Sequence, residues 1–246
     1  MRCMRPAVVL GAYLVGLVVT APATLLDAGL QSASDGRLRL AEAQGTLWSG
    51  AGLIEVRDAG GRIGIAKSFV WRFQPQSLLR GYLVCDVALD NATRPLTLTL
   101  SFSGIEFAAA DIDLPAMALG LAMPKLAPLG LSGEVSLHVE RLLIGRKGMQ
   151  GNASLHWRSA ASALTPVAPL GDYELRLDSQ GTTTHALLST LKGPLQLNGK
   201  GAWSNDTPPD FLVTAQVSRQ YQQQLVPLLR LIAIERGEGS FEVPLK

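Results

Sequence analysis

The chain has 246 residues, of which 47% are hydrophobic, and a formal net charge of +2. Arg2 and Arg5 account for that charge, so the rest is balanced and offers no basic surface for nucleic acid or an anionic membrane. Its two cysteines exclude a small disulfide-rich domain, and its length allows one or two domains.

An uncharged run extends from Pro6 to Leu26, directly after the two arginines. At about 1.5 Å per residue, a helix of this length crosses a hydrocarbon core of about 30 Å. Because both cations precede the run, the positive-inside rule predicts a cytoplasmic N-terminus over 1–5, a transmembrane anchor over 6–26 and an exported domain over 27–246.

A cleaved signal peptide is the alternative interpretation, because Ala21-Pro22-Ala23 places small residues near the end of the run. However, Pro22 fits poorly in the extended segment that a signal peptidase reads. The run is also longer than the roughly 7–15 residues of a typical signal core. A retained anchor is therefore preferred. It places Cys3 and Cys85 on opposite sides of the membrane, and Cys85 is expected to be buried in a strand.

After the anchor, residues 25–34 could extend the helix until Asp35-Gly36 ends it. From Arg37 onward, apolar residues alternate with polar ones, as in half-buried strands. The clearest example is 96–102, where Leu96, Leu98, Leu100 and Phe102 alternate with threonine and serine. Further strands are predicted around 37–40, 53–57, 63–73, 82–89, 135–139, 155–157, 173–177, 195–197 and 211–217.

Two short helices are predicted besides these strands. One is a single turn over 76–79, after Pro75; the other covers about 219–234, with Ser218 as its cap and Pro227 as an interruption. Residues 241–243 can then form a last strand. No long helices separate the strands, which disfavours a parallel sheet. The predicted fold is mainly β: an N-terminal transmembrane helix, a curved, mostly antiparallel multi-stranded sheet and a short C-terminal helix. The proline-rich, apolar stretch 114–132 is a candidate boundary between two halves.

The sequence contains no convincing catalytic arrangement. His138, His156 and His185 are scattered, without a partner at ligand spacing. Ser189-Thr190-Leu191-Lys192 matches the Ser-x-x-Lys motif of penicillin-recognising enzymes, but the companion motifs are missing. The acidic pairs Asp111/Asp113 and Glu235/Glu238 are interpreted as solvated turn residues. We therefore expect no enzyme, and no catalytic, cofactor-binding or metal site.

The remaining signals are motifs of tryptophan, glycine and proline. Gly45-Thr46-Leu47-Trp48-Ser49-Gly50 is followed by a segment from Trp71 through Pro75 to Gly81. Later, Trp157 precedes Pro169-Leu170-Gly171-Asp172-Tyr173, and Gly193-Pro194-Leu195 leads to Gly199, Gly201 and Trp203. Together with the anchor and the C-terminal helix, this series resembles protein N of the bacterial type II secretion system, over essentially the whole chain.

That resemblance implies a non-enzymatic accessory component in the inner membrane of Gram-negative bacteria. The protein would cross the membrane once, with its main domain in the periplasm. The implied partners are the secretin and the inner-membrane platform proteins, contacted during export of folded proteins across the outer membrane. Exposed strand edges and the apolar segment 117–126 offer ways to bind such partners. An alternative function is a membrane-anchored periplasmic protein that binds or transfers lipid in an apolar groove.

Overall fold

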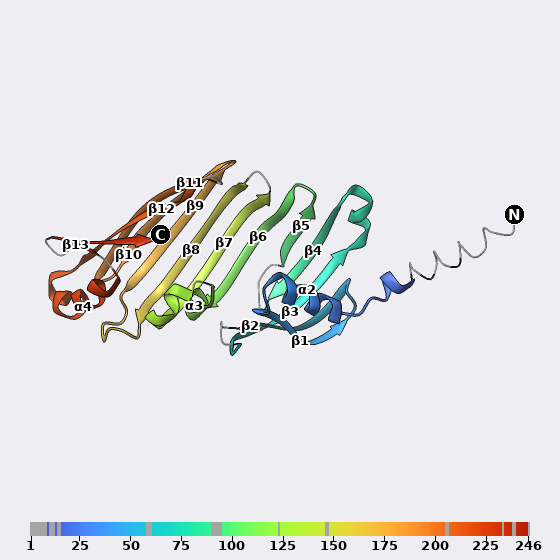
Figure 1. Cartoon of the computed structure of the whole chain (residues 1–246), viewed down its shortest axis with the longest axis horizontal. Coiled ribbons are helices and arrows are strands. Elements are labelled where there is room, and N and C mark those ends of the chain that lie inside the picture. Colours follow the sequence, from blue (N-terminus) through green and yellow to red (C-terminus); the bar gives the residue numbers. More distant parts are fainter. Residues whose placement is uncertain are drawn as a thin grey trace. The chain divides into compact units, whose positions relative to one another are not determined.

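A computed structural model describes residues 9, 13, 16–57, 61–89, 95–122, 124–145, 148–204, 207–232, 234–237 and 240–245. The chain divides into two compact units, Met1–Asn91 and Ala92–Lys246 (Figure 1). The predicted boundary stretch 114–132 lies within the second unit, where it connects two strands. The proposed domain bounds themselves stay a prediction.

Of the predicted anchor over 6–26, residues 6–8, 10–12, 14 and 15 lie outside the described residues. Residues 9, 13 and 16–19 are helical, and 24–26 belong to the next helix. Among the described residues, no helix has the length and apolar character to cross a membrane. Helix α2 (Thr24–Ala33) occupies the segment expected to extend the anchor helix. It is a separate helix, because Pro22 forms an isolated β-bridge with Thr46 immediately before it.

The described residues of the first unit form four antiparallel strands that pair in sequence order: β1 (Leu38–Gly45), β2 (Ser49–Arg57), β3 (Ile63–Gln74) and β4 (Tyr82–Leu89). The predicted turn after Pro75 is the 3-10 helix η1 (Pro75–Arg80). It ends at Gly81, whose positive φ of 82° suits glycine because a side chain would be strained there.

The second unit is an antiparallel sheet in which β5 to β12 follow sequence order, then β14, and β13 outermost. The strands are β5 (Leu96–Ser101), β6 (Gly104–Pro115), β7 (Leu131–Gly145), β8 (Gly148–Ser162), β9 (Gly171–Gln180), β10 (Thr183–Lys192), β11 (Leu195–Ser204), β12 (Thr207–Val217), β13 (Ile234–Gly237) and β14 (Ser240–Leu245). Helix α3 (Met117–Ala122) and the 3-10 helix η2 (Pro124–Leu129) connect β6 to β7. The predicted mainly β, antiparallel fold is confirmed.

The C-terminal helix is also confirmed, with differences in detail. The 3-10 helix η3 (Arg219–Tyr221) leads into α4 (Gln222–Ile232). Ser218 occupies the N-cap position of η3, as predicted, but its side chain makes no capping hydrogen bond. Pro227 does not interrupt α4, because a proline removes only one backbone donor and the helix tolerates that loss. The predicted final strand is β14, and β13 forms directly after the helix.

Two predictions about the middle of the chain need correction. Phe102 does not continue the alternating strand: it lies in the turn after β5 and is 95% exposed. Asp111 and Asp113 are not turn residues, because they lie within β6 and pair with β7. Glu235 likewise belongs to β13, whereas Glu238 lies outside the described residues. Strands β6 and β10 were absent from the sequence-based prediction.

Candidate binding surfaces

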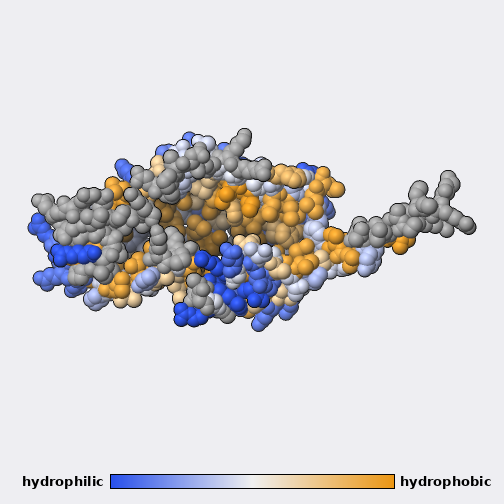
Figure 2. Space-filling view, viewed as in Figure 1, coloured by the Kyte–Doolittle hydropathy of each residue, from blue (hydrophilic) through white to orange (hydrophobic). Residues whose placement is uncertain are grey.

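The sheet of the second unit has one apolar face. The register aligns five of its residues side by side on neighbouring strands, and we call them the leucine row: Ile112, Leu137, Leu155, Leu175 and Leu188. All five keep part of their surface accessible to solvent. With neighbouring strands about 4.8 Å apart, the row is about 19 Å long. Part of this face is visible as the hollowed orange surface in Figure 2, where Figure 1 draws the middle strands of the unit.

Smaller and aromatic side chains flank the leucine row. On one side, Ala110, Val139 and Ala153 form a buried cluster on three adjacent strands. On the other side, Trp157 and Tyr173 pack with their ring centroids 5.8 Å apart. The Tyr173 hydroxyl donates a hydrogen bond of 2.9 Å to the Leu195 carbonyl, and burial raises the pKa of this phenol. The face therefore combines a central row of large side chains with a strip of smaller side chains, Ala110, Val139 and Ala153, beside it.

Helix α4 covers a different part of the apolar face. Leu225 and Leu229 are almost fully buried, and they belong to one core cluster with Leu195 and Ala215 from β11 and β12. The leucine row does not belong to that cluster. Within the described residues, the helix thus closes the core near β11 and β12, while the surface over β6 to β10 stays partly accessible.

The opposite face of the same sheet is mainly polar, although Leu187 and Leu212 are exposed on it, and it carries cross-strand contacts between histidines and carboxylates. His138 of β7 contacts the Asp111 carboxylate of β6, and His156 Nε2 of β8 lies 2.9 Å from Glu174 Oε1 of β9. Arg176 also binds Glu174, at 2.8 Å. Arg176 lowers the pKa of Glu174, burial opposes that shift, and His156 adds to the lowering. One solvent-exposed polar face and one apolar face are a common combination in antiparallel sheets.

The first pair of sequence motifs comes together in the first unit. The Trp71 indole lies against Gly50, where an added Cβ would be 2.5 Å from its ring carbon Cζ2. Its Nε1 donates a hydrogen bond of 3.1 Å to the Leu47 carbonyl. Trp48 packs edge-on against Phe73, with the ring centroids 6.5 Å apart. These motifs therefore build the core of the unit, and Gly50 leaves the space that the indole needs.

The second pair of motifs meets in the same way. Gly193 lies so close to Gly171 that an added Cβ would be 2.3 Å from the Gly171 Cα. Lys192 Nζ lies 3.1 Å from Asp172 Oδ2. The Leu195 amide donates to the Leu170 carbonyl over 3.1 Å. The motifs thus hold the start of β9 against the turn that precedes β11, which is a structural role.

The structure also places the other residues considered for chemistry. Ser189 and Lys192 lie on strand β10 rather than on a helix, so the Ser-x-x-Lys spacing does not bring them one helical turn apart. Cys85 is buried in β4 as expected, and burial raises the pKa of its thiol to about 11. Across the described part of the chain, no three His, Cys, Asp or Glu side chains converge as metal ligands would.

Sequence reasoning missed the leucine row and the His–carboxylate pairs. Each residue was visible as part of an alternating pattern, but their alignment depends on which strands are neighbours and in which register. Only β5 showed the alternation over its full length.

These observations define an open antiparallel sheet protein with one polar and one partly accessible apolar face. Residues 36–244 match the family model for type II secretion system (T2SS) protein N, so the chain belongs to that family of secretion machinery components. No curated protein and no solved structure matches the chain significantly.

Proposed function

We propose that this chain is an accessory component of the type II secretion system that acts in the periplasm and is held in the inner membrane by the part of the predicted anchor 6–26 that precedes Ala21. The observation that carries this proposal is the family match over 36–244, which covers both units. The role is a non-enzymatic one: the protein contacts the secretin, the platform proteins or both. Its sheets offer backbone edges and an apolar face for such contacts.

The test is to cross-link the full-length, tagged protein in its native envelope and identify what co-purifies. We expect secretin or platform subunits with the intact chain and none when residues 27–246 are deleted. Phospholipid recovered without any machine component would contradict the proposal.

A second candidate function is binding of a lipid acyl chain, and the leucine row favours it. The row is about 19 Å long, which exceeds the roughly 15 Å that one leaflet contributes to a hydrocarbon core. Leu155 and Leu175 lie at its centre, opposite each other on β8 and β9. An acyl chain laid across the strands would remove their exposed surface from water, at about 25 cal/mol per Å² of apolar area.

A matched pair of double variants tests this function. Leu155→Ser with Leu175→Ser alters the leucine row, whereas Leu187→Ser with Leu212→Ser alters exposed leucines on the opposite face of the sheet. Lipid that co-purifies with the protein is measured by mass spectrometry. Lipid binding predicts loss of phospholipid in the first pair and retention in the second; equal amounts in both pairs would refute it.

A further inference from the structure

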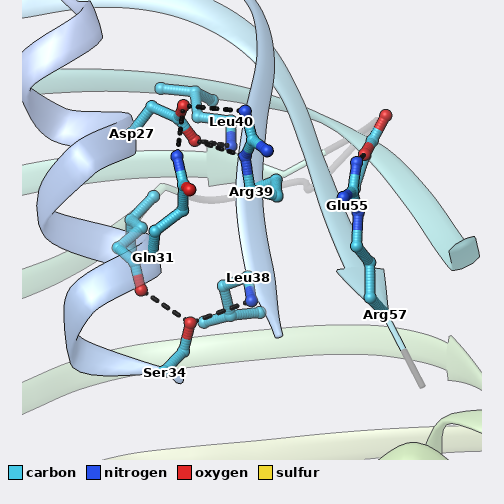
Figure 3. Close-up of polar contacts among 9 residues, drawn as sticks. Asp27, Gln31, Ser34, Leu38, Arg39, Leu40, Glu55 and Arg57 are labelled. Atoms are coloured by element: carbon cyan, nitrogen blue, oxygen red, sulfur yellow. Dashed lines mark hydrogen bonds and ion pairs between the residues drawn. The ribbon is translucent and has the colours of Figure 1, made fainter. Parts of the chain in front are cut away.

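The outer edge of β1 is covered by residues that precede it in the chain. In an antiparallel strand, successive amides point alternately toward the neighbour and away from it. The amides of Leu38 and Leu40 are directed away from β2, and two side chains of the α2 segment accept them (Figure 3). Asp27 Oδ1 accepts the Leu40 amide at 2.8 Å, and Ser34 Oγ accepts the Leu38 amide at 2.9 Å.

The other end of the same edge is covered by backbone. The Leu47 amide donates to the Ala21 carbonyl over 2.7 Å, and the Ala23 amide donates to the Gly45 carbonyl over 3.3 Å. These two bonds flank the bridge between Pro22 and Thr46. Residues 21–34 therefore lie along β1 from one end to the other, and we call them the edge cover.

Helix α2 makes several polar contacts with β1, and the buried residues of the edge cover, Ala21 and Ala23, precede the helix. None of its residues is buried, and its N-terminus has no side-chain cap. Asp27 is the centre of the polar contacts, because it also binds Gln31 and both Nε and Nη2 of Arg39. Burial would raise the pKa of Asp27, but the Leu40 amide, Arg39 and Gln31 outweigh burial and lower it.

The backbone amides and carbonyls beneath the edge cover are the groups to which a partner strand would hydrogen-bond. An uncovered edge strand presents amides and carbonyls in register for another chain, and extended peptides bind folded domains in this way. Removing Asp27 would leave the Arg39 guanidinium without this carboxylate, next to the exposed Arg37. An acidic side chain in the segment that replaces the cover would pair with Arg39 and so favour binding of that segment.

We propose that the edge cover is removable, and that an extended, acidic segment of another secretion component replaces it by adding a strand to β1. This inference rests on the proposed function for the identity of the partner. The cover begins at Ala21, inside the predicted anchor segment 6–26, so a movement at the membrane would act on it first. With the cover in place β1 is closed to partners; with the cover displaced it is open.

A disulfide staple tests whether the cover must leave. Pro22 and Thr46 form the closely spaced type of antiparallel pair, with Cα atoms about 4.5 Å apart, which lies within the range for a disulfide. The staple is Pro22→Cys with Thr46→Cys in full-length protein that also carries Cys3→Ser and Cys85→Ala. Each single cysteine variant is the control.

A photo-cross-linking amino acid is placed at Ala41 of β1 and, for comparison, at Leu79, which is 92% exposed on η1.

We expect the single variants to form an adduct between Ala41 and a secretion component in the native envelope. The adduct should fall to the level at Leu79 in the stapled protein and return when the staple is reduced. Recovery on reduction shows that the staple did not misfold the protein irreversibly. In the purified protein, the Leu38, Leu40 and Leu47 amides should exchange with solvent faster in Asp27→Ala than in Asp27→Asn, which keeps an acceptor.

Two results would overturn the inference and leave the proposed function standing. One is an adduct at Ala41 whose amount is the same with and without the disulfide staple. The other is recovery of machine components with no adduct at Ala41 in any variant. If no machine component is recovered with any variant, the proposed function itself fails and this inference fails with it.

Discussion

Only glycine fits at position 50, because the Trp71 indole and the Gln44 carbonyl occupy the space in which a Cβ would lie. This one position ties two sequence motifs, 45–50 and 71–81, into a single core. A glycine that is needed for packing can thus look like a functional signature in a sequence. The same argument applies to Gly193 and Gly171 in the second unit.

Replacing Gly50 should therefore destabilise the first unit. In Gly50→Ala the new methyl would overlap Trp71 and the Gln44 carbonyl, and overpacking of this kind costs about 1–3 kcal/mol. Urea unfolding followed by tryptophan fluorescence measures the change. Gly29→Ala is the control, because nothing lies within 4 Å of its added Cβ and alanine favours a helix. Equal stability of Gly50→Ala and the unmodified protein would contradict the packing argument.

Glu174 should make stability depend on pH in the acidic range. Its pKa is lowered by Arg176, against the effect of burial, and further by His156. A carboxyl with a lowered pKa in the folded state stabilises the fold above its unfolded pKa of about 4.5, and this contribution is lost as the pH falls through the folded pKa. The free energy of unfolding of Glu174→Gln should therefore fall less between pH 6 and pH 3, where urea unfolding is measured. Parallel curves for both proteins would rule out this role.

At the scale of single elements, α4 closes the core with a few leucines. Leu225 is 0% exposed and Leu229 is 1% exposed, and both contact the cluster formed with β11 and β12. The amphipathic spacing of these leucines was visible in the sequence, and it correctly predicted the helix. It could not identify the strands beneath the helix, because that depends on the pairing of residues far apart in the chain.

We expect Leu225→Ala to reduce the free energy of unfolding by about 2–5 kcal/mol, since it empties space in this cluster. The control is Leu212→Ala on β12, because Leu212 is 50% exposed and its truncation leaves no cavity. Chemical denaturation followed by circular dichroism gives both values. A loss at Leu225 no larger than at Leu212 would show that α4 does not close the core.

Strand prediction succeeded where polar and apolar residues alternate regularly, as in β5. It failed at β6, because three successive alanines over 108–110 blur the alternation and Asp111 and Asp113 have the composition of a turn. It failed at β10, because threonine and alanine stand on the apolar face at Thr184 and Ala186. The contact between Asp27 and Leu40 joins residues 13 positions apart, and no local pattern reveals it.

At the scale of the whole molecule, the edge cover, residues 21–34, lies between the helical residues 16–19 and β1 and covers the edge of that strand. In the proposed topology, the same segment also carries the chain away from the membrane. The family match begins at residue 36, just beyond this segment. Its position outside the membrane is a prediction that labelling can test.

Ser32 is exposed on α2, so Ser32→Cys should react with a membrane-impermeant maleimide added to the periplasmic side of intact spheroplasts. The unmodified protein should not react, because the Cys85 thiol is buried with its pKa raised to about 11, and Cys3 is predicted to be cytoplasmic. The protein should also stay with the membrane fraction until detergent is added. Labelling of Ser32→Cys only after the membrane is disrupted would reverse the proposed topology.

From β6 to β11, each strand pairs with the strands that precede and follow it in the sequence. Contacts of this kind are local, so the sheet can grow hairpin by hairpin without closing long loops. The same arrangement makes its length adjustable during evolution. Inserting or deleting one hairpin would change the span of the leucine row by two strand spacings, about 10 Å, while every remaining strand keeps an antiparallel neighbour. Related chains could thus present apolar rows of different length without a new fold.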